Sequence, residues 1–151
     1  MNNRERGARV YHNMNHYHIL ANSSEEQVCR LASMVLQSYE KSQVKLLSGP
    51  RQALVMLRVR ETVANSLFHG GEVLVTEVKL ELDEQFGFGI ISGDRPRQAM
   101  AIALVDAGLR KGGLVAEQLR HDLAELDRQL ERSKQHLQAL VATTKVDFER
   151  M

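Results

Sequence analysis

The chain has 151 residues, 43% of them hydrophobic, and its 20 basic and 19 acidic side chains leave a formal charge of +1. This near-neutral balance gives no general attraction to nucleic acid or anionic lipid, and the single cysteine, Cys29, excludes an internal disulfide and suits a reducing compartment. No apolar run reaches the length of a membrane span and the N-terminus lacks the apolar core of a signal peptide, so we expect a cytoplasmic protein of one domain with an appendage.

The N-terminal segment is rich in Asn, Arg and His and shows little periodicity, so residues 1–15 are expected to form a mobile arm. His12 and His16 would share one face of a helix, and with His18 they are a candidate zinc site. We favour a solvated polar arm, because there is no helix signal here and no cysteine or acidic third ligand near these histidines.

A first helix is predicted to begin near Ser23 and to end near Lys41. Ser23 and Glu26 fit the Ser-x-x-Glu capping box, in which each side chain bonds to the other residue's backbone amide. Cys29 lies near the apolar stripe of this helix and is interpreted as a small core residue. The stripe itself recurs at helical spacing and consists of Val28, Leu31, Ala32, Val35 and Leu36.

Strand-like segments with tight links follow, which predicts an α+β fold with an antiparallel meander of about four strands. Ser48-Gly49-Pro50 is a turn signal, Gly70-Gly71 breaks the chain, and Asp83-Glu84-Gln85 form a further turn. The expected strands are Gln43–Leu47, Ala53–Arg60, Glu72–Leu82 and Phe86–Ile91.

The two central strands share an unusual distribution of apolar residues. One face of Ala53–Arg60 is apolar throughout, while the other changes from Leu54 and Met56 to Arg58 and Arg60. Glu72–Leu82 repeats this pattern, although a sheet exposed to water is expected to be polar along one whole face. We therefore expect a sheet covered on one side and half covered on the other, with protein–protein contact supplying the missing cover.

Glycines and a charged cluster precede the second helix. Gly87 and Gly89 alternate with larger residues in a strand, so another backbone can approach closely there. The Gly87-x-Gly89-x-x-x-Gly93 spacing does not match a phosphate-binding loop, and Asp94 is instead predicted to be the N-cap of a helix containing Pro96. Asp94, Arg95 and Arg97 either cap this helix or bind a partner carboxylate, and both readings stay open.

The second helix is rich in small residues and is predicted to lie flat on the sheet, with Asp106 at its edge rather than acting as a catalytic acid. A long final helix follows and carries a heptad seam. At about 1.5 Å per residue, Leu114–Val141 spans roughly 40 Å, which exceeds the width of a small domain. We therefore expect this helix to project and its outer half to contact another chain. The seam consists of Ala116, Leu119, Leu123, Leu126, Leu130, Ser133, Leu137 and Leu140.

These elements suggest an α+β domain over residues 16–112, followed by a partner-binding helix and tail over residues 113–151. No nucleophile–base pair, carboxylate dyad or metal set emerges from the spacing, so no catalytic, cofactor or metal residue is assigned. The expected partner contacts are Asp94, Arg95, Arg97, Leu126, Leu130, Leu137 and Phe148.

Several motifs resemble the PhnG family, the G subunits of the bacterial carbon–phosphorus lyase system. The family commonly carries a Trp-Met pair where this chain reads His16-Tyr17-His18, and an Arg-Asp order where this chain has Asp94-Arg95. The matching segments are Leu20-Ala21-Asn22-Ser23, Gly71-Glu72-Val73, Gly93-Asp94-Arg95-Pro96-Arg97-Gln98-Ala99, Ala103-Leu104-Val105-Asp106-Ala107 and Ala142-Thr143-Thr144-Lys145-Val146-Asp147-Phe148.

The resemblance implies an accessory subunit of a transferase complex, alpha-D-ribose 1-methylphosphonate 5-triphosphate synthase, in which the chain is not catalytic alone. Its partners would be the H, I and J subunits, two copies of each. The complex converts ATP and an alkylphosphonate to a ribose 1-phosphonate 5-triphosphate and adenine. ATP is then a substrate of the complex, and this subunit binds no cofactor.

The exposed apolar surface predicts that the isolated chain forms homo-oligomers or aggregates. Two other hypotheses remain: a stand-alone nucleotide- or phosphonate-binding protein that uses Gly93–Arg97, and a regulatory coiled-coil homodimer.

Overall fold

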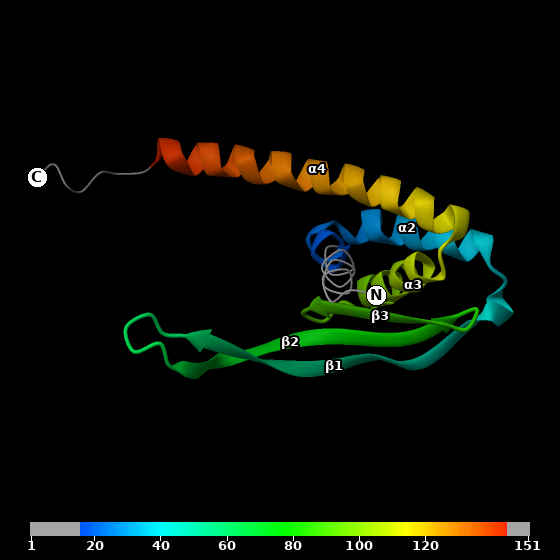
Figure 1. Cartoon of the computed structure of the whole chain (residues 1–151), viewed down its shortest axis with the longest axis horizontal. Coiled ribbons are helices and arrows are strands. Elements are labelled where there is room, and N and C mark those ends of the chain that lie inside the picture. The colour runs from blue at the N-terminus through cyan, green and yellow to red at the C-terminus, as the bar shows by residue number, and fades with distance from the viewer. Residues whose placement is uncertain (1–15, 145–151) are drawn as a thin grey trace, which may run out of the picture.

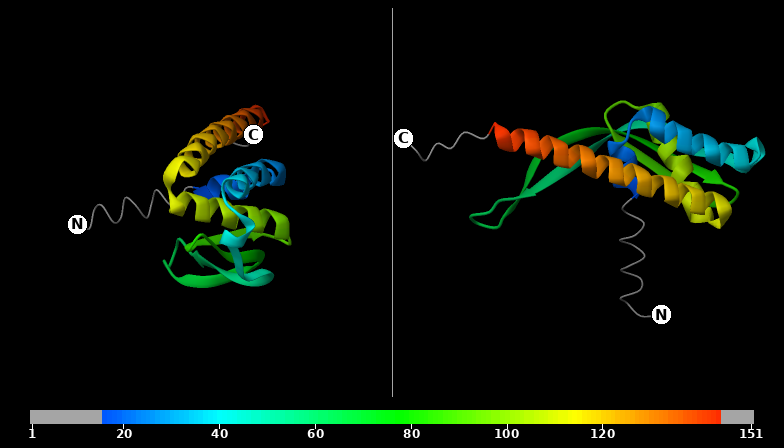
Figure 2. Two further views of the ribbon diagram at one scale, coloured as in Figure 1. Left: turned by 90° about the vertical axis from the view of Figure 1, so that its right-hand side faces the viewer. Right: turned by 90° about the horizontal axis from the view of Figure 1, so that it is seen from above.

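The computed structural model describes residues 16–144, so the expected arm, His12 and Phe148 lie outside the described residues. Within this range the α+β prediction is confirmed: a three-stranded antiparallel sheet in the order β1-β2-β3 is combined with four α-helices (Figure 1). Figure 2 shows the layers, with α3 on the sheet and α2 and α4 above it. No helix in residues 16–144 is both long and apolar enough to cross a membrane.

The first helices are set by local hydrogen bonds. Residues 16–22 are helical, and the Ser23 hydroxyl donates to the Ile19 carbonyl at 2.7 Å. Ser23 is therefore occupied by the preceding turn, and Ser24 caps α2 (Glu25–Ser38) in a capping box with Gln27. The predicted Ser23–Glu26 box was wrong by one residue.

Most of the predicted α2 stripe is buried. Leu36 is the exception, because it is 46% exposed at the end of the helix. A 3-10 turn, Lys41–Gln43, then leads into the sheet. The buried stripe residues are Val28, Leu31, Ala32 and Val35.

The sheet has three strands rather than about four, because two expected breaks lie inside strands. β1 (Val44–Arg60) passes through the predicted turn at Gly49 and Pro50 with shifts of register, and pairing with β2 resumes at Arg51. β2 (Leu67–Leu82) likewise runs through Gly70-Gly71. A bulge absorbs extra residues without ending the ladder, so turn residues alone did not mark the strand ends.

The turn between β2 and β3 (Gln85–Ser92) is confirmed at Asp83 and Glu84. Both have positive φ, 45° and 66°, as a tight two-residue hairpin turn requires.

α3 (Pro96–Lys111) lies against β3 at very short range. A Cβ atom at Gly87 would overlap the carbonyl oxygen of Ala103, and one at Gly89 would overlap that of Ala99. The predicted close backbone approach at these glycines is therefore confirmed, and α3 rests directly on the sheet.

The start of α3 differs from the prediction. Its N-cap is Arg95 rather than Asp94, and no side chain from the cap residue bonds to the helix. The Thr76 hydroxyl accepts the Arg95 amide at 3.0 Å and donates to the Gly93 carbonyl at 2.6 Å. A buried hydroxyl on β2 thus bonds to the backbone on both sides of Asp94.

α4 (Gly113–Thr143) is only partly held by the rest of the fold. Ala116, Leu119 and Leu123 are buried, whereas Leu137 is 62% exposed near the far end. In Figure 1, the outer part of α4 extends beyond α2. The projecting helix was correctly predicted, and the core lies between the sheet, α2, α3 and the first half of α4.

Candidate protein-interaction surfaces

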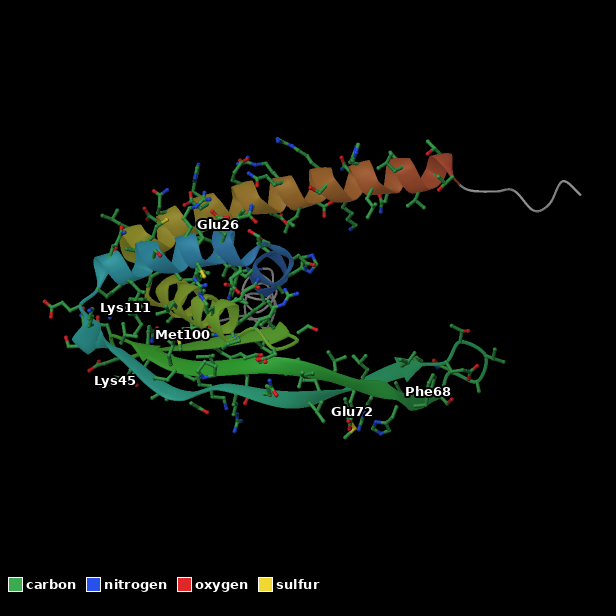
Figure 3. All side chains as sticks on the ribbon, turned by 180° about the vertical axis from the view of Figure 1, so that it is seen from behind. Glu26, Lys45, Phe68, Glu72, Met100 and Lys111 are labelled. Atoms are coloured by element: carbon green, nitrogen blue, oxygen red, sulfur yellow. The ribbon has the colours of Figure 1, made fainter. Side chains whose placement is uncertain are left out.

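The outer part of the β1–β2 hairpin projects away from the helices. We call residues 54–74 the hairpin arm; Figure 3 shows Phe68 and Glu72 on this extension. At its tip, the Glu61 carboxylate accepts the amides of Val63 and Ala64 at 2.7 and 2.9 Å, which gives the connection a defined shape. The exposed large apolar residues of the β1 and β2 parts of the arm are Leu54, Val55, Met56, Leu57, Val59, Leu67, Phe68 and Leu74.

The strand register assigns these side chains to two faces, since residues directly opposite each other on paired strands share a face. One face of β2 carries Val78 and Leu80 beneath the helices, and its continuation in the arm carries the Leu54–Leu74 pair. This helix-side face becomes basic toward the tip, where Arg58 lies opposite His69.

The opposite face, which we call the far face, is apolar in the arm. Elsewhere it carries both charged and apolar residues, since Phe86 and Ile90 of β3 lie opposite Glu81 and Glu77 of β2. In the arm it presents the pairs Val55–Val73 and Val59–Phe68. Nearer the domain it carries ion pairs, Lys45 with Glu81 and Arg51 with Glu77. The expectation of one covered side was wrong for the arm, because exposed apolar residues lie on both faces there.

The seam of α4 provides a second apolar surface. Leu126 and Leu130 are half-buried against the core cluster, and with Gln27 and Ser133 they line a groove of about 150 Å³ between α2 and α4. Leu137, Leu140 and Val141 are exposed. Of the seam residues predicted to meet a partner, Leu137 is free to do so, while Leu126 and Leu130 already contact their own chain.

The charged cluster at the start of α3 is exposed, and one of its members pairs with α2. Asp94, Arg95 and Arg97 all face solvent, and Arg97 makes an ion pair of 3.4 Å with Glu25. Arg97 also borders an apolar groove of about 370 Å³ between α2, α3 and β1. The other residues that line this groove are Cys29, Ala32, Ser33, Leu36, Pro50, Pro96, Met100, Ala101 and Leu104.

A buried polar cluster around Asp106 was missed by the sequence interpretation. Asp106 was placed at a helix edge, but it is 0% exposed, and its carboxylate accepts from His16 Nε2 at 2.9 Å, the Phe88 amide at 2.9 Å and Arg110 Nε at 3.0 Å. The available signal was a lone carboxylate among the small apolar residues of α3, with an arginine four positions later.

Electrostatics fix the charge of this cluster. Burial by itself would raise the pKa of Asp106, but hydrogen bonds from His16, the Phe88 amide and Tyr17, with the nearby Arg110 guanidinium, lower that pKa below its ordinary value. Burial and the negative charge of Asp106 together raise the pKa of Tyr17 to about 12. Asp106 is therefore a carboxylate at neutral pH, and Tyr17 is a neutral phenol.

Two histidines of the candidate zinc site, His16 and His18, lie among the described residues and have different surroundings. His16 is buried on Asp106, whereas His18 is exposed and contacts Asn22. Within residues 16–144, no three His, Cys, Asp or Glu side chains are grouped as metal ligands. Every buried side-chain polar atom in the same range has a hydrogen-bond partner.

A family model described as "Phosphonate metabolism protein PhnG" matches residues 13–151. A search of curated proteins finds no match.

Proposed function

Because the chain belongs to the PhnG family of phosphonate metabolism proteins, we propose that it is an accessory subunit of the carbon–phosphorus lyase core complex. In this proposal it assembles with the H, I and J subunits in the cytoplasm. The assembly then carries out the ATP-dependent conversion of an alkylphosphonate to a ribose 1-phosphonate 5-triphosphate, with release of adenine.

The observation that supports this proposal most is the apolar surface on two projecting elements. The hairpin arm exposes nine large apolar side chains, the eight named above and Val63, and the end of α4 exposes three more, Leu137, Leu140 and Val141. Each such side chain contributes roughly 1.5–3 kcal/mol when it is fully removed from water. Contiguous apolar surface of this kind is typical of an interaction site, so partner subunits would gain a large favourable free energy by covering it.

We propose a supporting rather than a catalytic role because the buried ionisable groups serve the fold. Asp106 is fully buried, and its carboxylate is engaged by His16, Arg110 and a backbone amide. At the start of α3, Thr76 already accepts the Arg95 amide, a group that would otherwise be available to an anionic ligand. In this proposal ATP is a substrate of the assembly, and its reacting atoms lie in another subunit.

The proposal is tested by measuring adenine release from ATP and methylphosphonate. The H and I subunits are assayed with and without this chain, which we expect to be required for full activity. Equal rates in both mixtures would reject the accessory role. Calorimetry of the isolated chain with ATP and with methylphosphonate is the matched test, and tight binding of either would favour the stand-alone binding protein instead.

A further inference from the structure

The two edges of the sheet differ in how they are protected. At the β3 edge, the Phe88 amide donates to Asp106 rather than to β2, and Asp106 is held in turn by His16. A side chain from α3 therefore occupies an amide that an added strand would need. Natural sheets commonly block an edge in this manner to prevent pairing with another chain.

Among residues 16–144, nothing protects the β1 edge along the arm in a comparable way. β1 pairs with β2 on one side only, so its other side is an edge of the sheet. Residues 52–60 contain no proline, and the extra residue at the register shift between Leu57 and Arg58 is Gly70, which belongs to β2 rather than to β1. The outward backbone groups of residues 52–60 thus form a regular edge that can accept another strand.

Charge on the arm indicates what kind of strand would fit. Arg58 and Arg60 lie on the same face, and neither makes an ion pair with a residue in the range 16–144. Arg60 instead donates to the side-chain oxygen of Asn65 at 3.0 Å. Opposite charges on neighbouring strands stabilise their pairing, so a carboxylate beside each arginine would complete this edge.

We propose that residues 52–60 of β1 receive an extended segment of a partner protein as an added strand, with apolar residues beside positions 53–57 and Asp or Glu beside Arg58 and Arg60. This inference rests on the proposed function, since it assigns the partner contact to a particular edge. A second copy of this chain fits less well. Paired antiparallel over the same residues, it places Leu54 and Gln52 beside the arginines and supplies no carboxylate.

Residue-resolved amide exchange distinguishes strand addition from packing on a face. The full-length chain is compared alone and in the complex co-expressed with the H, I and J subunits. Along a strand the amides alternate in direction, so an added strand slows exchange at every second residue of 52–60, by about tenfold or more. If exchange at residues 52–60 is unchanged in an intact complex, the strand addition is rejected while the proposed function stands. Failure to co-purify overturns the proposed function as well. Concentration-dependent protection of alternate residues of 52–60 in the isolated chain assigns the edge to a second copy and rejects the inference, whereas self-association through a face of the arm gives no alternation.

A charge variant provides the second arm of the test. The double substitution Arg58→Glu and Arg60→Glu is expected to weaken association about tenfold or more and to remove the alternating protection. Lys41→Glu is the matched control, because Lys41 is exposed in the turn before β1, at the other end of the strand. Circular dichroism checks that both variants fold. Equal effects of the two variants, or none, would contradict the proposed carboxylate contacts.

Discussion

The imidazole of His16 and the carboxylate of Asp106 lie 2.9 Å apart and connect the first described helix to α3 across 90 residues of sequence. The same carboxylate accepts the Phe88 amide, so one buried side chain joins the first helix, α3 and β3. This arrangement fixes the part of the fold from which the hairpin arm and α4 project.

Replacing Asp106 should destabilise the fold more than replacing an exposed acidic residue. We expect Asp106→Asn to lower the free energy of unfolding by about 3 kcal/mol, because the buried donor of His16 and the partly exposed guanidinium of Arg110 lose their charged acceptor. Urea denaturation measures this change. The control is Asp83→Asn, which removes an exposed ion pair with Lys111 and should have little effect. Similar losses in both variants would contradict the role given to Asp106.

The pH dependence of the unfolding free energy should reveal the ionisation of the Asp106 carboxylate. Since the pKa of Asp106 is lowered in the folded state, its contribution to stability is present above the pKa of the unfolded chain, about 4, and is lost as the pH falls through the folded value. The stability difference between the wild type and Asp106→Asn should therefore shrink below about pH 4. Denaturation curves between pH 3 and pH 7 test this, and a constant difference would be inconsistent with it.

The contact between β3 and α3 should tolerate no side chain at Gly89. A Cβ atom there would overlap the Ala99 carbonyl, which belongs to a helix backbone and cannot move aside cheaply. We expect Gly89→Ala to destabilise the fold by about 3 kcal/mol or more. Thermal unfolding compares it with Ser92→Ala, an exposed position at the end of the same strand. A near-native melting temperature for Gly89→Ala would show that α3 does not rest on the strand this closely.

The hairpin arm should control the behaviour of the isolated chain. We expect the wild type to self-associate, and the double substitution Leu54→Gln and Met56→Gln to reduce this, because both side chains are exposed on one face of the arm. Unfolding free energy should change by no more than about 0.5 kcal/mol. Light scattering over a range of concentrations measures the association. A wild-type chain that stays monomeric throughout would refute the prediction.

Substitutions in the α4 seam should distinguish internal packing from partner binding. Leu137→Asp should weaken association with the I subunit while preserving stability, because Leu137 is exposed. Leu126→Asp and Leu130→Asp should abolish association but also destabilise the chain, because both residues are half-buried against the core. Pull-down with the I subunit and urea denaturation are compared for each variant. Gln138→Asp, next to Leu137 but off the seam, is the control, and equal losses of binding in both would argue against seam recognition.

Sequence patterns identified those features that depend on local periodicity. The heptad seam predicted the long helix and its exposed end at Leu137, and alternating glycines predicted the close contact at Gly87 and Gly89. The tight turn at Asp83 and Glu84 was also found. Each of these signals arises from residues near one another in the chain.

Features that depend on tertiary contacts could not be predicted in the same way. Gly49-Pro50 and Gly70-Gly71 resemble strand ends, but pairing between β1 and β2 continues past both. The start of α3 differs from the prediction, and the hydroxyl of Thr76, on a distant strand, holds the backbone there at Gly93 and Arg95. Asp106 was misplaced since its donors His16 and Phe88 are separated from it by 90 and 18 residues.

Native mass spectrometry of the co-expressed G, H, I and J subunits tests most directly whether partner proteins cover the exposed apolar surface of this chain. We predict one species that contains this chain together with all three partners. A monomer of this chain, well behaved in solution and absent from a complex formed by the other three, would contradict the account.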